Sequence, residues 1–195
     1  MAKVKWRGGA LLAPVPPVMV SCGDMEKSNI ITVAWTGILN TVPPKTYISV
    51  RPSRYSYELI KNSGEFVINL SPAELIRTVD SCGVYTGRKV DKFQKYGLTK
   101  VQASEVSAPL IGECPLSLEC RVTDVIPLGS HDMFIADVVA ADVEDSLVDK
   151  DGKLHLDRAH LAAYAHGEYF ELGKKIGSFG FSVKKKKKAP KAIKK

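Results

Sequence analysis

Short apolar or alternating runs follow one another along most of this 195-residue chain. They are rich in Val, Ile, Thr and aromatic residues, and Pro or Gly separates many of them, which is typical of β-strands. The pattern predicts strands at residues 15–21, 30–35, 46–50, 65–70, 116–125 and 133–143.

Helical patterns are fewer, and we expect helices at residues 54–62, 73–82, 88–96 and 157–164. The sequence has no internal repeat and no regular alternation of strands with helices, which disfavours a doubly wound parallel sheet. It also lacks the glycine-rich motifs of Rossmann and P-loop nucleotide sites. We therefore predict a mainly β fold with a few helices, built as an antiparallel barrel.

The composition, with 45% hydrophobic residues, fits one globular domain. The net charge of +7 has a local origin, because residues 184–195 contain eight of the 28 basic residues and no acidic residue. The other 183 residues carry 20 basic and 21 acidic residues. We therefore expect a domain over residues 1–183 and a disordered Lys-rich tail over residues 184–195. Such a tail either attracts nucleic acid or anionic lipid or is simply a solvated end.

Four cysteines are widely spaced, with no C-x-x-C pair and no His at zinc-site spacing: Cys22, Cys82, Cys114 and Cys120. This spacing predicts no metal site and favours buried thiols, with a redox role for Cys82 and Cys114 as the alternative. No apolar run resembles a signal peptide or reaches membrane-spanning length, so the expected location is the cytoplasm, without a membrane partner.

A basic turn, Arg-Pro-Ser-Arg-Tyr-Ser at residues 51–56, separates an expected strand from an expected helix. Ser53 is the expected N-cap, and Gly64 suits the end of the helix. A helix start favours an anion, and Arg51, Arg54 and the serines add hydrogen-bond donors. Taken alone, the turn is either a solvated loop or a phosphate site.

A second basic turn, Thr-Gly-Arg-Lys-Val-Asp-Lys-Phe, occupies residues 86–93. Gly87 allows the chain to bend close to a ligand. The alternative is again a solvated helix face, but two basic turns together favour a shared phosphate.

The run Ser-Asn-Ile-Ile-Thr-Val-Ala-Trp at residues 28–35 has small and polar residues among apolar ones. It is either a buried core strand or a strand whose backbone edge accepts a flat, polar-edged ring, with room beside Ala34. His131 precedes an expected strand and is either structural or placed to protonate a reduced ring or contact a nicotinamide.

These segments occur in the order seen in flavin reductase-like proteins, together with the runs 14–17, 43–44, 63–69, 108–109 and 129–131. The C-terminal runs 164–173 and 176–180 are similar as well. The chain most resembles the flavoredoxin branch of this family, over about residues 10–182. The specificity of the resemblance lies in the ordered set rather than in any one motif.

The resemblance implies an antiparallel Greek-key split barrel that binds FMN, usually as a homodimer with the flavin near the subunit interface. Asn29, Thr32, Ala34 and Trp35 would line the isoalloxazine ring. The phosphate would be held by Ser49, Arg51, Arg54 and Ser56, with help from Thr86, Lys89 and Lys92. The other implied cofactor-binding residues are Val33, Tyr55 and Phe93. His131 would be catalytic, and Tyr164 and Tyr169 would belong to a segment that covers the site.

The implied activity is that of an FMN-dependent oxidoreductase. It would move electrons from NAD(P)H through bound FMN to free flavin, ferric iron or a protein acceptor. One alternative is a non-enzymatic FMN electron carrier reduced by a partner protein. Another is a nucleic-acid-binding barrel that uses the Lys-rich tail, which the near-neutral domain and the lack of a basic-aromatic stripe disfavour.

Overall fold

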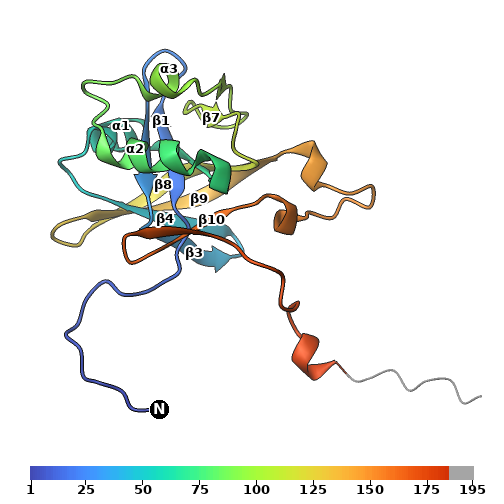
Figure 1. Cartoon of the computed structure of the whole chain (residues 1–195). Helices are drawn as coiled ribbons and strands as arrows, with labels where there is room; N and C mark the ends of the chain where they lie inside the picture. The colour runs from blue at the N-terminus through green and yellow to red at the C-terminus, as the bar shows by residue number, and fades with distance from the viewer. Residues whose placement is uncertain (185–195) are drawn as a thin grey trace, which may run out of the picture.

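The computed structural model describes residues 1–184, which form a mainly β structure (Figure 1). Most of the predicted Lys-rich tail, residues 185–195, lies outside this range. Seven strands form one sheet in the order β2-β1-β5-β8-β9-β4-β3, and every neighbouring pair is antiparallel. These strands are β1 (Val18–Gly23), β2 (Ser28–Val33), β3 (Thr36–Thr41), β4 (Pro44–Val50), β5 (Glu65–Asn69), β8 (Leu116–Pro127) and β9 (Asp132–Val143). The predicted fold class, mainly β and antiparallel, is confirmed.

The sheet curls around one main core, to which alternate residues of most strands contribute. Val18 and Val20 of β1 lie in this core with Phe66 of β5 and Phe134 of β9. Helix α1 (Tyr55–Ser63) adds Ile60 and so closes part of the barrel. Every second residue of a strand points to the same face of the sheet, and the residues on the inner face form this core.

Strands β1 and β2 are buried on both faces. Met19 and Ile30 face away from the main core and pack in a second cluster with Val79, Cys82 and Phe93. The last three residues come from α2 (Ile76–Val84) and α3 (Lys92–Tyr96), which lie outside the barrel (Figure 1). This double coverage explains why most residues of both strands are buried, polar ones such as Ser21 and Asn29 included.

The ends of the helices differ in part from expectation. Gly64 ends α1 with φ of 68°, and its N–H donates to the Ile60 carbonyl, as predicted. The predicted N-cap at Ser53 is wrong, because the N-cap is Arg54 and no side chain caps the helix. Helix α3 begins later than expected, because the Asp91 side chain accepts from the Gln94 N–H and caps the helix there.

The predicted helix at residues 157–164 is also wrong. Leu156–Arg158 is one turn of 3₁₀-helix, and β10 (Ala162–Ala165) pairs with β11 (Glu168–Glu171). The two connecting residues, His166 and Gly167, have φ of 53° and 87°, as a tight hairpin turn requires. Strand pairing therefore overrides the helix propensity of an alanine-rich segment.

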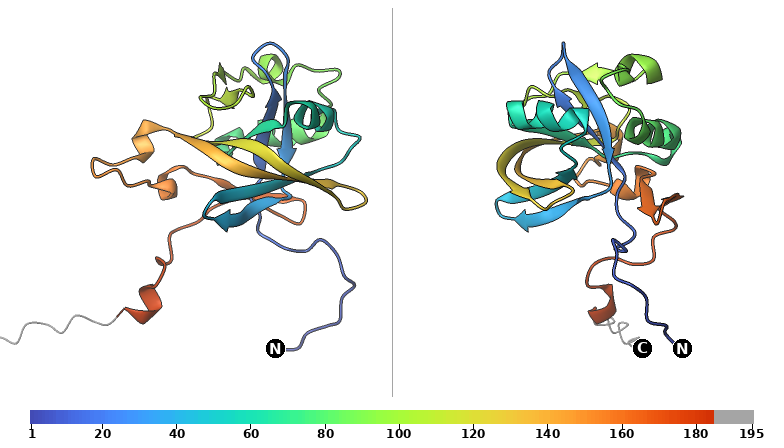
Figure 2. Two further views of the ribbon diagram at one scale, coloured as in Figure 1. Left: turned by 180° about the vertical axis from the view of Figure 1, so that it is seen from behind. Right: turned by 90° about the vertical axis from the view of Figure 1, so that its left-hand side faces the viewer.

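Strand β3 and two further short strands were not expected from the sequence. Strands β6 (Lys100–Val101) and β7 (Leu110–Ile111) form a small hairpin. The predicted helix at residues 73–82 begins with a 3₁₀ turn, Ala73–Leu75, which precedes α2. Seen from behind, the β8–β9 hairpin extends to one side of the body (Figure 2). Residues 1–14 and residues 172–184 leave the body on the side away from α1, α2 and α3 (Figures 1 and 2).

The barrel is open between β2 and β4. These strands have no ladder between them, although the Ser49 N–H donates to the Trp35 carbonyl at 2.9 Å where the chain leaves β2. The end of β2, the end of β4 and the start of α1 meet at this opening, and the candidate site lies there.

Candidate functional site

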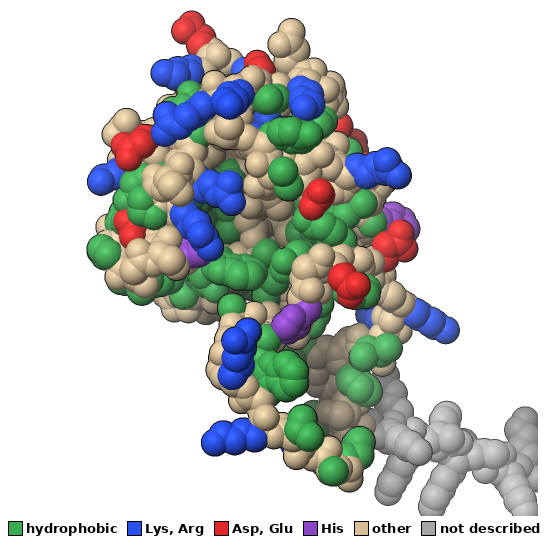
Figure 3. All heavy atoms as spheres, turned by 60° about the vertical axis from the view of Figure 1, so that its left-hand side comes forward, with side chains coloured by type: hydrophobic (Ala, Val, Ile, Leu, Met, Phe, Trp, Pro, Cys, Tyr) green, Lys and Arg blue, Asp and Glu red, His purple; other side chains and the backbone are tan. Residues whose placement is uncertain are grey.

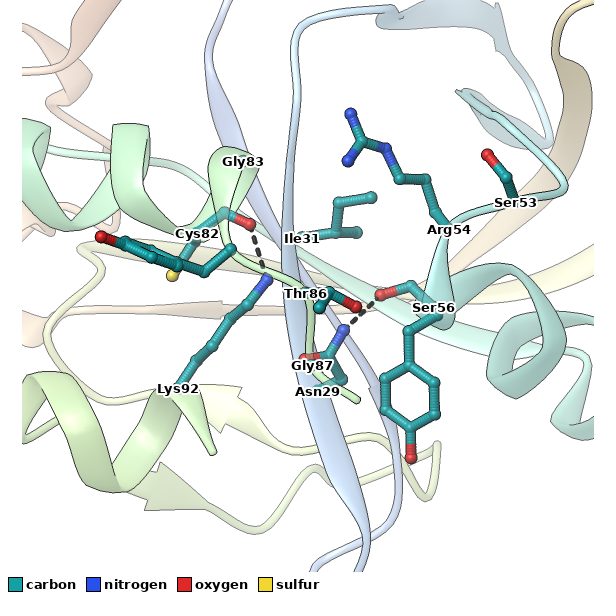
Figure 4. Close-up of a pocket in the computed structure, with 12 residues that line it drawn as sticks. Asn29, Ile31, Ser53, Arg54, Ser56, Cys82, Gly83, Thr86, Gly87 and Lys92 are labelled. Atoms are coloured by element: carbon teal, nitrogen blue, oxygen red, sulfur yellow. Dashed lines mark hydrogen bonds between the residues drawn. The ribbon is translucent and has the colours of Figure 1, made fainter. Parts of the chain in front are cut away.

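A cavity of about 140 Å³ lies between β2, the start of α1 and the segment between α2 and α3 (Figure 4). We call it the first cavity. Its lining contains one arginine, one lysine and no carboxylate, and consists of Asn29, Ile31, Ser53, Arg54, Tyr55, Ser56, Cys82, Gly83, Tyr85, Thr86, Gly87 and Lys92. The structure therefore brings the two predicted basic turns together around one site.

The base of the first cavity is held by a hydrogen bond between two buried side chains. The Asn29 amide donates to the Ser56 hydroxyl at 2.7 Å, which joins β2 to the first turn of α1 (Figure 4). The start of α1 presents backbone N–H groups and the positive end of the helix dipole to the same side. This arrangement favours a negatively charged group.

Lys92 differs from the solvated lysine of a basic turn, because only 2% of it is exposed. Its ammonium donates to the carbonyl oxygens of Ile30 and Cys82, both at 2.6 Å, and Figure 4 shows the bond to Cys82. Burial is the main cause that lowers the pKa of Lys92. An ammonium has three donors, so one remains for a ligand in the first cavity.

Gly87 lies against the base of the first cavity. A Cβ atom at this position would come within 2.1 Å of Asn29 Oδ1 and 2.7 Å of Tyr55 Cδ1. Any side chain would therefore displace the amide that bonds Ser56. Glycine is required here for the close approach of the backbone.

A second cavity of about 100 Å³ lies at the opening between β2 and β4. It shares only Ile31 and Arg54 with the first cavity, and its other lining residues are Thr32, Val33, Trp35, Ser49, Val50, Arg51 and His131. Burial and the charges of Arg51 and Arg54 lower the pKa of His131.

A third, larger cavity of about 570 Å³ adjoins the second through Trp35 and Ser49. Its walls are mostly apolar and include Ala34, Leu39, Tyr47, Leu128, Met133 and residues 9–12 of the N-terminal segment. Trp35 stays 41% exposed, and its ring lies 6.5 Å from that of Tyr164. A planar aromatic ligand would fit such a slot.

The structure distributes the predicted site residues over these cavities unevenly. Ser49 and Arg51, predicted beside the phosphate with Ser56, line the second cavity and not the first. Lys89 is exposed and lines none of the three cavities. Phe93 lies in the second core cluster, behind the site.

The two predicted cover residues also have separate positions. Tyr164 lines a further cavity of about 200 Å³ beside Trp35, and its ring lies 5.4 Å from that of Tyr169. Tyr169 packs against the second core cluster, and its hydroxyl donates to Asp80. Only Tyr164 therefore lies next to a predicted ring residue.

Some lining residues were missed from the sequence. Cys82, Gly83 and Tyr85 line the first cavity from the end of α2, and Tyr47 and Met133 line the third. None of these residues belongs to a recognisable sequence motif, and their position at the cavities depends on how α2 and the β4–β9 pair pack. The one sequence signal near the end of α2 was the basic turn at residues 86–93.

All four cysteines are free thiols, and three of them are buried. Burial raises the pKa of Cys22 and Cys82 to about 11 and that of Cys114 and Cys120 to about 12. A thiol with such a pKa is a poor nucleophile at neutral pH. This favours the buried-thiol interpretation over a redox role.

Within residues 1–184, no group of three or more His, Cys, Asp and Glu side chains is placed to hold a metal ion. In the same part of the chain, no helix has both the length and the apolar character needed to cross a bilayer.

In the space-filling view, Lys and Arg side chains gather over the end of the molecule that carries the helices, with hydrophobic side chains below them (Figure 3). The first cavity opens among these helices.

Comparison with known proteins identifies relatives over most of the chain. The sequence pattern described as "Flavin reductase like domain" matches residues 11–173. An uncharacterized protein of Archaeoglobus fulgidus is 32% identical over 159 residues, which cover 82% of this chain and 88% of the relative. The flavoredoxin of Desulfovibrio vulgaris (Miyazaki F) superposes with a TM-score of 0.87 at 29% identity, over 94% of this chain and 100% of that chain. The flavoredoxin from Methanosarcina acetivorans gives a TM-score of 0.84 at 25% identity, with the same coverage.

Proposed function

The chain belongs to the flavin reductase-like family, and from this premise we propose that it binds FMN and is an oxidoreductase. It would take electrons from NAD(P)H and pass them through the flavin to free flavin, ferric iron or a protein acceptor. The first cavity is the observation that carries the proposal, because it suits the phosphate of FMN.

The donor set of the first cavity fits a phosphate monoester. Arg54 and the third donor of Lys92 supply positive charge, while Ser56 and Thr86 supply hydroxyl groups. The backbone at Gly87 can approach closely because it has no side chain. No carboxylate in the lining opposes a dianion. Charge-assisted hydrogen bonds of this kind are among the strong ones.

The second and third cavities suit the rest of the cofactor. Thr32 and Val33 continue along β2 from the first cavity, Trp35 follows in the connection to β3, and Ala34 lines the large apolar cavity. These residues would position the ring and limit its contact with water. When bound, FMN supplies the hydride and electron chemistry, and the protein supplies orientation and charge.

His131 is the proposed catalytic residue. It lines the second cavity beside Trp35 and Arg51. Because its pKa is lowered, the imidazole is neutral near pH 7 and can accept a proton there. Its role would be to hold or move a proton at the edge of the site.

We further propose a homodimer in the cytoplasm. Large apolar side chains are exposed on β3 and on the β3–β4 and β8–β9 turns, with exposures of 85% for Ile38, 86% for Val42 and 57% for Leu128. Leu128 also lines the third cavity, so a partner subunit on this surface would lie beside the ring. Exposed apolar patches commonly mark such interfaces. The free thiols support a reducing compartment.

The second candidate is an electron carrier that binds the same flavin but receives electrons from a partner protein. The similarity to two flavoredoxins over nearly the whole chain supports this second candidate. It uses the same phosphate site and differs in the source of electrons.

The test is the visible spectrum of the purified protein, followed by anaerobic titration with NADH and with NADPH. The oxidoreductase proposal predicts a yellow protein that bleaches with at least one of them. Persistent oxidised absorbance with both, combined with rapid reduction by a ferredoxin-type donor, would establish the carrier instead. A colourless protein that takes up no added FMN would reject both.

A further inference from the structure

The β8–β9 hairpin carries His131 near its end, beyond the part of the sheet that holds β8 on its outer side. The ladder between β5 and β8 ends at Arg121, whereas β4 pairs with β9 as far as Asp132. Residues 123–130, which we call the hairpin tip, are all exposed. The position of His131 therefore depends on how the start of β9 is held.

A buried tyrosine of α1 holds the start of β9. The hydroxyl of Tyr57 donates to Oδ2 of Asp132, the first residue of β9, at 2.6 Å. Tyr57 is 5% exposed, and its ring meets that of Phe134 edge to face, with 5.3 Å between the ring centroids. Helix α1 therefore contacts the beginning of β9 through both a polar and an apolar group.

The hydrogen bond between Tyr57 and Asp132 is of the strong kind. Its acceptor is a carboxylate, and the bond raises the pKa of Tyr57, so the hydroxyl keeps its proton and remains the donor. Hydrogen bonds to ionised groups stabilise more than neutral ones. The bond joins residues 75 positions apart, so its loss is not compensated by a neighbour in the chain.

Fixing Asp132 also fixes the direction of His131. Successive residues of an extended strand point to opposite faces. Asp132 and Phe134 face α1, while His131 and Met133 line the second and third cavities on the other face. The backbone of His131 is held on its other side by the hairpin turn, in which the Leu128 N–H donates to the His131 carbonyl at 2.9 Å.

Charged and titratable groups surround this arrangement on three elements: Arg51 and Arg54 in the turn before α1, Glu58 and Lys61 on α1, and His131 at the tip. Burial and the two arginines lower the pKa of His131. If the tip moved away from the body, His131 would lose both influences. Its pKa should then rise toward the ordinary value.

We infer that Tyr57 is a positioning residue for His131. Its hydroxyl holds Asp132 against α1 and thereby keeps the imidazole directed into the second cavity. This inference rests on the proposed function for the role of His131. It also goes beyond that function, because Tyr57 and Asp132 line none of the three cavities of the site.

The experiment compares the full-length wild-type protein, as purified, with Tyr57→Phe, which keeps the ring and removes the hydroxyl. NMR follows the pH titration of the His131 ring, assigned with His131→Gln, and the exchange of the Leu128 amide with solvent. We expect the pKa of His131 to rise and the Leu128 amide to exchange roughly 10-fold faster or more, the scale of one lost hydrogen bond to a charged group.

Substitutions of Asp132 test the same bond from its other end. Asp132→Asn keeps an oxygen that accepts from Tyr57, so exchange of the Leu128 amide should stay close to that of the wild type. Asp132→Ala removes the acceptor and should reproduce the fast exchange of Tyr57→Phe. This variant also replaces Tyr57→Phe in the comparison if the latter does not fold.

The double variant Tyr57→Phe/Asp132→Asn separates position from charge. If the hydroxyl acts by holding the tip, exchange of the Leu128 amide stays fast and the pKa of His131 stays raised. If both return to wild-type values, the single variant had acted through the freed carboxylate of Asp132, and the inference is overturned.

The matched control is Tyr96→Phe. The Tyr96 hydroxyl is buried and has no hydrogen-bond partner among residues 1–184, so its removal should change neither measurement. The inference is also overturned if Tyr57→Phe gives the same His131 pKa and the same Leu128 exchange as this control.

Failure of the proposed function would give a different result. If NADH and NADPH leave the wild-type protein oxidised, the NMR differences still show whether Tyr57 positions His131. If the wild-type protein is reduced, Tyr57→Phe should keep its FMN content and be reduced roughly 10-fold more slowly, again the scale of one such bond. Unchanged NMR measurements in an active protein would reject the positioning role alone.

Discussion

The side-chain amide of Asn29 donates to the hydroxyl of Ser56 at 2.7 Å, and both side chains are buried. The two residues are 27 positions apart and belong to β2 and α1. This bond holds the helix start in position against the strand, and the shape of the first cavity depends on it.

Ser56→Ala should therefore destabilise the protein. The Asn29 amide would be buried without its acceptor, which costs about 1–3 kcal/mol of the free energy of unfolding. Urea denaturation of the flavin-free protein measures this change. Ser53→Ala is the control, because Ser53 is exposed in the same turn, and its effect should stay within about 0.5 kcal/mol. Equal stabilities of the two variants would contradict the structural role of the bond.

Arg54→Ala should weaken FMN binding by about 1.5–3 kcal/mol, the scale of a hydrogen bond to a charged group. Because Arg54 is exposed and forms no salt bridge among residues 1–184, the flavin-free protein should keep its stability. Quenching of FMN fluorescence on titration gives the affinity. An unchanged affinity would remove Arg54 from the phosphate site.

Gly87→Ala should abolish tight FMN binding, because the new Cβ would collide with the Asn29 amide at 2.1 Å. The same collision should lower the melting temperature. Gly173→Ala is the matched control, since a Cβ there meets no atom within 4 Å. Calorimetry and FMN titration of both variants test the prediction, which fails if Gly87→Ala binds FMN as the control does.

His131→Ala should retain FMN and slow turnover. The residue lines the second cavity and lies outside the first, so the phosphate contacts remain. The ratio of flavin to protein after gel filtration and the rate of anaerobic reduction by NAD(P)H separate the two effects. If the variant folded normally but lost its flavin, His131 would be a cofactor-binding residue and not a catalytic one.

The four thiols should react slowly with a disulfide reagent at pH 8 in the native protein and rapidly in urea. Their pKa values of about 11 to 12 keep them protonated when folded, above the ordinary value of 9.0. The folded state thus binds more protons than the unfolded state between these values. The thiol contribution to stability should be present below pH 9 and be lost as the pH rises from about 9 toward 12. Fast reaction of the native protein would contradict this burial.

The sequence allowed most of the sheet to be predicted, because two-residue periodicity and β-branched residues mark strands that face a core. It also identified the two basic turns, and the structure places residues of both around one cavity. The expected family is confirmed by the match over residues 11–173, and the expected split barrel by the superposition on flavoredoxins.

What could not be predicted depends on tertiary packing. The alanine-rich segment at residues 162–165 has helix propensity, and only its pairing with β11 makes it a strand. Lys92 was predicted beside the phosphate as part of a basic turn, but its burial and the donation of its ammonium to the carbonyls of Ile30 and Cys82 were not expected. Arg51 and Ser56 belong to the same basic turn but line different cavities, which no local pattern encodes.

Arg54 lines both the first and the second cavity. A ligand in either one acts on the same guanidinium, so the two occupancies are thermodynamically linked. Whatever factor occupancy of one cavity imposes on binding in the other, the second must impose on the first. The phosphate end and the ring end of the proposed FMN site are therefore coupled through this one side chain, and a change at Arg54 should alter both ends together.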